Sequence, residues 1–66
     1  MYDEYETFHL IKELTDNSIP VGTLGVVLMV LDNDTYEVEF PDGKGGNLGK
    51  DMTYTITECF MKRTQN

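Results

Sequence analysis

The stretch that decides the fold is Thr35-Tyr36-Glu37-Val38-Glu39-Phe40. Three apolar side chains, Tyr36, Val38 and Phe40, alternate in it with two carboxylates. Side chains two positions apart along a β-strand lie on the same face of the sheet. The alternation therefore predicts a strand that buries its apolar residues and exposes Glu37 and Glu39. We expect Pro41-Asp42-Gly43 to end this strand, because proline presets φ and glycine accepts a positive φ.

A nearly continuous apolar run, from Thr23 to Leu31, precedes this strand. Such a run is typical of a strand that is buried on both faces or interrupted by a bulge. Gly25 within it predicts a bulge or a sharp bend. The connecting Asp32-Asn33-Asp34 is short and tolerates left-handed backbone conformations, as a hairpin turn requires. The two runs are therefore expected to form one antiparallel hairpin.

Shorter segments on either side supply the remaining strands. Thr7 to Leu14 predicts a strand, with a short helix as the alternative, and Met52 to Ile56 alternates apolar residues with threonines. Thr57 to Phe60 predicts one tight turn capped by Thr57, after which Phe60 and Met61 form a last short strand. Short strands separated by turn residues indicate a small sandwich or barrel. We predict one all-β domain over residues 1–66, with five strands, at most one short helical turn, and a core at about residues 7–62.

Length and charge limit what such a domain can do. A chain of 66 residues buries only about 60% of its unfolded surface, and few chains this short enclose an active-site pocket. Residues 1–42 hold ten acids and one base, whereas residues 43–66 hold two acids and four bases. The net charge of −7 repels phosphate backbones and attracts basic proteins. No apolar run is as long as a membrane span, and the acidic N-terminus and single cysteine favour a cytoplasmic protein.

Three motifs that suggest chemistry fail on residue identity. The glycine-rich stretch Gly43 to Lys50 resembles a phosphate-binding loop, but lysine stands at its first glycine position and Asp51 would repel phosphate. Asp32-Asn33-Asp34 resembles the start of a calcium loop but lacks the glycine and glutamate that must follow. His9 and Cys59 have no orienting residue or oxyanion loop for nucleophilic catalysis. We therefore expect no catalytic residue, no metal site and no cofactor.

Two segments are distinctive in combination: Ile19-Pro20-Val21-Gly22-Thr23-Leu24-Gly25-Val26-Val27, and Tyr36-Glu37-Val38-Glu39-Phe40 followed by Asp42-Gly43. Together they resemble a bacterial family of small SH3-like barrels that is catalogued as a domain of unknown function. The resemblance covers residues 8–62 and departs at Lys44 to Lys50, which carries extra glycines. It implies an SH3-like fold without catalysis. Some such proteins resemble immunity proteins of contact-dependent or polymorphic toxin systems.

The resemblance and the acidic charge together predict an immunity-type inhibitor that binds a cognate basic nuclease toxin and blocks its active site. The expected contacts are five carboxylates on and beside the central strand: Asp32, Asp34, Glu37, Glu39 and Asp42. The alternative for the two glutamates is a solvated strand face that discourages edge pairing. The segment from Tyr2 to Glu6 is either a frayed terminus or a tail that grips the partner's lysines and arginines.

Two other classes of function remain open. SH3-like barrels dock peptides or join larger assemblies, which would require an exposed aromatic groove formed by Tyr36, Tyr54 and Phe60. Nucleic-acid binding would require a basic stripe through four residues, Lys44, Lys50, Lys62 and Arg63. The spacing of the aromatic residues favours the core, and the net charge disfavours nucleic acid. We therefore expect a protein partner, with no direct contact to nucleic acid or membrane.

Overall fold

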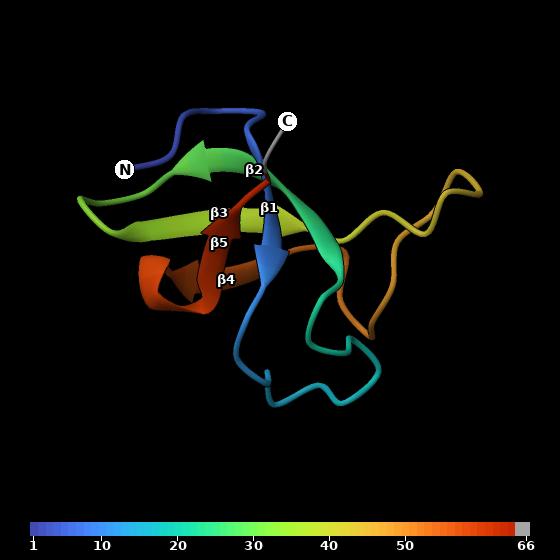
Figure 1. Cartoon of the computed structure of the whole chain (residues 1–66). Helices are drawn as coiled ribbons and strands as arrows, with labels where there is room; N and C mark the ends of the chain where they lie inside the picture. The colour runs from blue at the N-terminus through green and yellow to red at the C-terminus, as the bar shows by residue number, and fades with distance from the viewer. Residues whose placement is uncertain (65–66) are drawn as a thin grey trace.

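The computed structural model describes residues 1–64, which form one curled antiparallel sheet (Figure 1). The elements in chain order are β1 (Thr7–Leu10), β2 (Leu24–Val30), β3 (Thr35–Glu39), β4 (Tyr54–Thr57), the 3-10 turn η1 (Glu58–Phe60) and β5 (Met61–Arg63). The strands lie in the order β4-β3-β2-β1-β5, and every neighbouring pair is antiparallel. The sheet curls into a half-barrel. The predicted all-β class, the five strands and the single helical turn are confirmed over this range.

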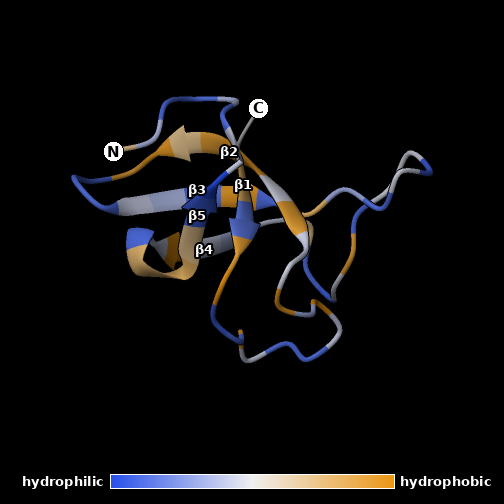
Figure 2. Cartoon of the chain, viewed as in Figure 1, coloured by the Kyte–Doolittle hydropathy of each residue, from blue (hydrophilic) through white to orange (hydrophobic). Residues whose placement is uncertain are grey.

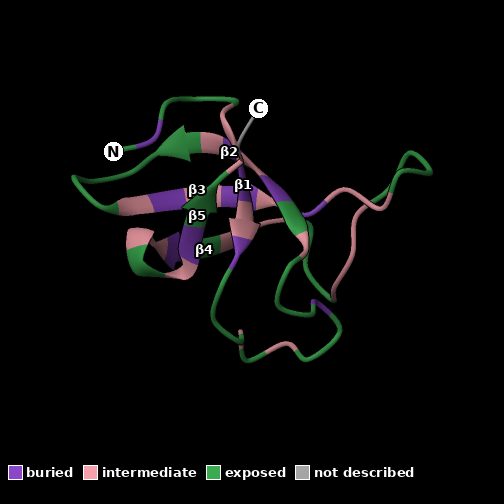
Figure 3. Cartoon of the chain, viewed as in Figure 1, coloured by how far each residue is buried: buried purple, intermediate pink, exposed green. Residues whose placement is uncertain are grey.

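Burial follows the alternation of β3. Tyr36, Val38 and Phe40 are completely buried, and Figure 3 shows buried and half-buried positions taking turns along the strand. The enclosed face of the sheet holds the core, which consists of Tyr2, Phe8, Leu10, Ile19, Val27, Tyr36, Val38, Phe40, Ile56 and Met61. Aromatic rings meet edge to face within it, as between Phe8 and Phe40, whose centroids lie 5.8 Å apart. The apolar half of the β3 prediction is therefore confirmed.

The bulge predicted for β2 exists, but it does not lie at Gly25. The register of β2 against β3 shifts between Val27 and Met29, so Leu28 is the extra residue. Gly25 instead pairs regularly with Phe8 of β1. A Cβ added at Gly25 would lie 2.3 Å from Cζ of Phe8. Glycine is needed there because the Phe8 ring crosses the strand, and the prediction of a bulge at this residue is wrong.

Several predicted boundaries move by a few residues. β1 ends at Leu10, and the chain continues as a loop without the alternative short helix. β4 begins at Tyr54, so Met52 lies in the preceding loop with 77% of its surface exposed rather than facing the core. The last strand begins at Met61, because Phe60 still belongs to the helical turn. Alternation predicted these strands but did not fix where hydrogen bonding to the neighbouring strand stops.

The N-terminal segment is docked on the barrel at Tyr2. The Tyr2 side chain is 3% exposed and meets the Phe8 and Tyr36 rings edge to face, with centroids 6.3 and 5.6 Å away. The Arg63 guanidinium lies over the Tyr2 ring, 4.4 Å from its centre. The core therefore begins before residue 7. Tyr2 is therefore neither frayed nor part of a free tail, and both interpretations of this segment are wrong at that residue. Tyr5, in contrast, is 70% exposed.

Candidate functional site

The two glutamates of β3 lie on the outer face of the sheet, away from the core. Glu37 stands opposite Met29 of β2 and Thr55 of β4, and Glu39 stands opposite Val26 of β2. Both glutamates are half-buried, since β3 is an inner strand and its neighbours flank them. Their shared position on the face away from the core is confirmed. The expectation that they are fully exposed is wrong.

Both oxygens of the Glu37 carboxylate accept hydrogen bonds from threonine hydroxyls. Thr53 donates to Oε2, and Thr55 donates to Oε1 at 2.8 Å. These two bonds stabilise the charged form and lower the pKa of Glu37 below its ordinary value. Each oxygen keeps a further lone pair for an outside donor. Glu37 is therefore an ionised acceptor with a fixed orientation at neutral pH.

Glu39 and the turn residues Asp32 and Asp34 have fewer partners than Glu37. The Glu39 carboxylate accepts no hydrogen bond and forms no ion pair with any of residues 1–64. Asp32 accepts a bond of 2.8 Å from the backbone of Asn33, and Asp34 accepts one of 3.2 Å from the hydroxyl of Thr35. Both aspartates are exposed in the β2–β3 turn. They lie where a partner can reach them.

Asp42 lies at the other end of β3 and has a local structural role. Its Oδ1 accepts hydrogen bonds from the backbone nitrogens of Lys44 at 2.7 Å and Gly46 at 3.1 Å. These bonds fold the glycine-rich loop back on itself. At about 3.3 Å per residue, β3 from Thr35 to Glu39 spans roughly 13 Å and separates the turn aspartates from Asp42. The structure therefore brings Glu37 and Glu39 to one face, but it places Asp42 and the turn aspartates at opposite ends of it.

Most of the negative charge is not neutralised within the fold. The described residues contain two ion pairs, between Arg63 and Glu6 at 2.6 Å and between the Met1 ammonium and Glu58 at 3.1 Å. Ten of the twelve acidic side chains therefore take part in no ion pair within residues 1–64. The field around the molecule is that of a strongly acidic surface.

One acid that sequence reasoning missed is Asp16, which joins two loops. Its carboxylate accepts hydrogen bonds from the Ser18 hydroxyl at 2.5 Å, the Tyr54 hydroxyl at 2.5 Å and the Lys50 backbone nitrogen at 2.7 Å. These bonds hold the pKa of Asp16 well below its ordinary range. The Asp16-Asn17-Ser18 turn is recognisable from sequence. The contacts to Tyr54 and Lys50 span more than thirty residues and leave no local signal.

His9 and Cys59 occupy separate elements. His9 lies half-buried on β1, opposite Leu24 and Lys62, as an ordinary strand residue. Cys59 lies in η1 and is exposed. Its hydrogen bond with the Thr57 hydroxyl and the nearby Lys12 ammonium lower the pKa of its thiol.

Thr57 does occupy the N-cap position of η1, but its side chain makes no capping hydrogen bond there. Its hydroxyl lies 3.2 Å from the Cys59 sulfur instead. The predicted turn is therefore confirmed, and the predicted role of Thr57 as its side-chain cap is wrong.

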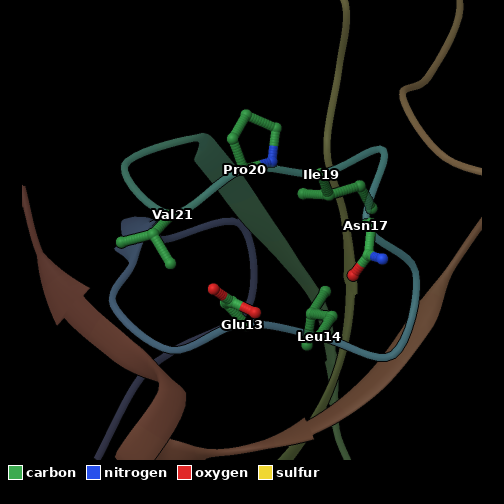
Figure 4. A pocket seen from close by; sticks show the side chains of 6 residues that line it. All are labelled: Glu13, Leu14, Asn17, Ile19, Pro20 and Val21. Atoms are coloured by element: carbon green, nitrogen blue, oxygen red, sulfur yellow. The ribbon is translucent and has the colours of Figure 1, made fainter.

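The loop between β1 and β2 encloses a shallow pocket of about 350 Å³. It is lined by Glu13, Leu14, Asn17, Ile19, Pro20 and Val21. Figure 4 shows Glu13 and Leu14 facing Pro20 and Ile19 across it. Its lining includes one carboxylate and neither a histidine nor a cysteine, so the residues that line it offer no pair of base and nucleophile.

Within residues 1–64, no group of three or more His, Cys, Asp or Glu side chains is arranged to hold a metal ion. The same residues contain no helix of the length and apolarity needed to cross a membrane. Comparison of the chain with protein-family models, with curated proteins and with solved structures gave no match. The resemblance to the SH3-like immunity family therefore stays a prediction.

Proposed function

We propose that this protein is a non-enzymatic, immunity-type inhibitor that binds a cognate basic nuclease toxin and blocks its active site. The observation that carries the proposal is the excess of free negative charge. Ten acidic side chains are left without an ion pair among the described residues, on a chain of net charge −7. A nuclease must hold a polyanion, so its cleft is basic. A surface of this kind is complementary to such a cleft.

The inhibitor would act by placing carboxylates where phosphates otherwise lie. Glu37 is suited to this role because its two threonine partners hold it charged and oriented before any partner arrives. Glu39 is suited because its carboxylate has no partner to give up within residues 1–64. Asp32 and Asp34 extend the charge past the end of the strand. Complementary charge also speeds encounter, which matters for a protein that must capture a toxin quickly.

Asp42 contributes least to this proposal, since its carboxylate already organises the glycine-rich loop. The peptide-docking alternative is weakened by burial of the aromatic residues it needs. Tyr36 is completely buried, and Tyr54 and Phe60 are half-buried against the core. The nucleic-acid alternative is weakened for a different reason. Arg63, one residue of the basic stripe it requires, is already paired with Glu6.

The proposal is tested with the protein encoded beside this chain. That neighbour is expressed in bacterial cells alone and together with this chain, and its nuclease activity is assayed after purification. We expect a neighbour that kills cells by cleaving nucleic acid, full protection by this chain, and a stable complex without nuclease activity. A harmless neighbour, or a toxic one that neither binds this chain nor is inhibited by it, would show that the protein has another function.

A further inference from the structure

The outer face of β2 carries a stripe of apolar side chains. Leu24 and Met29 are 44% and 55% exposed, and Val26 and Leu28 between them are half-buried. The intervening Gly25 and Val27 are buried on the opposite face. Figure 2 shows the hydrophobic colour along β2 beside the hydrophilic stretch of β3. Contiguous exposed apolar surface marks either a binding site or an aggregation site. This stripe is therefore a candidate binding surface.

The bulge in β2 enlarges this stripe next to a carboxylate. A register shift between Val27 and Met29 makes Leu28 the extra residue, so Leu28 and Met29 together stand opposite Glu37. Two residues further along β3, Glu39 stands opposite Val26. Side chains of directly opposed residues on neighbouring strands lie about 5 Å apart. Apolar surface and negative charge therefore adjoin at two pairs of residues that are neighbours on the outer face, on either side of the inward-facing Val27–Val38 pair.

Lysine and arginine are the side chains that combine the complementary features. Each has an apolar stem that covers hydrophobic surface and a cation at its end. A side chain that crosses from β2 to β3 would pack its stem on Met29 or Val26 and bring its cation to Glu37 or Glu39. Arginine fits best, because its planar fork bonds a carboxylate through two N–H groups.

We propose that the outer face of the β2–β3 hairpin is an arginine-binding surface for a basic protein. We call this surface the β2–β3 face, formed by Leu24, Val26, Leu28, Met29, Glu37 and Glu39. Arginine or lysine stems of the partner lie across its apolar stripe, and their cations meet the two glutamates. The inference takes the identity of the partner, a nuclease, from the proposed function.

Charge favours a basic protein over a second copy of this chain as the partner of the β2–β3 face. A second copy of this chain would bring another net charge of −7 against the same carboxylates. A basic protein supplies the opposite charge and the stems at once. We therefore infer a basic protein as the partner. The tests below also detect self-association.

The first test does not depend on the natural partner. The full chain, labelled for NMR, is titrated with the peptide acetyl-Arg-Val-Arg-Val-Arg-Val-amide. We expect shifts at the methyl groups of Leu24, Val26, Leu28 and Met29 and at the amides of both glutamates. The peptide with serine in place of valine should shift the same residues with weaker affinity. Shifts centred on acids elsewhere, such as Glu13 and Asp51, or no saturable shifts, would overturn the inference.

The second test uses two exposed methionines, one on the β2–β3 face and one outside it. Met29 lies on the β2–β3 face, and Met52 lies in the loop before β4 with 77% of its surface exposed. We expect Met29→Ser to weaken binding of the valine-containing peptide by about fivefold and Met52→Ser by less than about twofold, because only one of them contacts arginine stems. Unchanged thermal unfolding of both variants shows that the fold is intact. Equal effects of the two variants would overturn the inference.

The same variants separate this inference from the proposed function when they are mixed with the neighbouring nuclease. If the peptide maps to the β2–β3 face but no nuclease complex forms, the surface stands and the proposed function fails. If the nuclease complex forms and Met29→Ser weakens it no more than Met52→Ser does, the function stands and the surface is wrong. A dimer of this chain that Met29→Ser dissociates would show that a second copy occupies the face, which also overturns the inference.

Discussion

The hydroxyl of Tyr36 donates a hydrogen bond of 2.9 Å to Oε1 of Glu58. The same hydroxyl oxygen accepts a bond of 2.9 Å from the backbone nitrogen of Tyr2. The opposite oxygen of Glu58 receives the Met1 ammonium at 3.1 Å. One phenol near the start of β3 therefore fastens both the N-terminal segment and the turn before β5 to the core.

Tyr36→Phe is expected to reduce the free energy of unfolding by about 1–3 kcal/mol, because it leaves the buried backbone nitrogen of Tyr2 without an acceptor. Tyr5→Phe removes the same hydroxyl from a side chain that is 70% exposed and should change stability by less than about 0.5 kcal/mol. Urea unfolding of both variants measures the difference. Equal stabilities would show that the bond from Tyr2 does not contribute.

The hydrogen bonds to the Asp16 carboxylate predict that the folded chain loses stability in acid. Hydrogen bonds from Ser18, Tyr54 and the backbone of Lys50 hold the pKa of Asp16 below its ordinary value of 3.8. A carboxyl group with a depressed pKa in the folded chain stabilises it fully above the unfolded-state pKa, and this contribution is lost as the pH falls through the folded-state value. Thermal unfolding measured from pH 6 to pH 2 should therefore show a decline that begins near pH 4.

Asp16→Asn should lower the melting temperature at pH 6 and make this acid decline shallower, because the amide does not titrate. Asp51→Asn, a change of the same type at an exposed acid, is the control and should leave the decline intact. An acid decline of the same steepness in Asp16→Asn and the unmodified chain would rule out this carboxylate as a source of the pH dependence.

Gly25→Ala is expected to destabilise the fold by about 1–3 kcal/mol, because the new methyl group would overlap the Phe8 ring in a closely packed core. The matched control is Gly46→Ala in the glycine-rich loop, where the nearest atom is a side-chain oxygen of Asp42 at 3.1 Å and no core ring is in contact. Chemical denaturation compares the two variants. A stable Gly25→Ala variant would mean that Phe8 does not cross the strand at this point.

His9→Ala and Cys59→Ala are each expected to leave inhibition of the nuclease unchanged within about twofold, because neither side chain has a catalytic partner in the structure. Inhibition titrations with the purified nuclease test this expectation. Complete loss of inhibition in either variant, while the protein remains folded, would indicate a chemical rather than a steric mechanism.

Local pattern was enough to predict the centre of the fold. Tyr36, Val38 and Phe40 are spaced by two, so their burial on one face followed from strand geometry alone. The position of Tyr2 could not be predicted, because its contacts to Tyr36 and Arg63 span about half and nearly all of the chain. Alternation predicts a strand but does not predict which distant segment will cover its end.

The candidate site was predictable to a similar degree. The alternation placed Glu37 and Glu39 on the outer face, which is where they lie. The apolar run of β2 suggested burial on both sides or a bulge, and hydropathy alone did not reveal that Leu24 and Met29 stay exposed beside those glutamates. The hydroxyls that hold Glu37 come from a strand and a loop about seventeen residues away, and only the register of β4 brings them together.

The central claim, that β3 carboxylates meet a basic cleft, is tested most directly by the association rate of Glu39→Lys with the neighbouring nuclease. Glu39 is the better choice for reversal, since Glu37 also bonds Thr53 and Thr55. The control is Glu4→Lys, which makes the same change in net charge at an exposed acid in the N-terminal segment. Rates are measured by stopped flow from roughly 50 to 500 mM salt, a range over which the Debye length falls well below about 10 Å.

We predict that association of the unmodified chain slows steeply with salt and that Glu39→Lys associates at least about tenfold more slowly than Glu4→Lys, because it adds repulsion at the contact itself. Equal weakening by the two reversals would mean that only net charge contributes and that β3 is not the site. Association that is independent of salt and unaffected by Glu39→Lys would contradict the account.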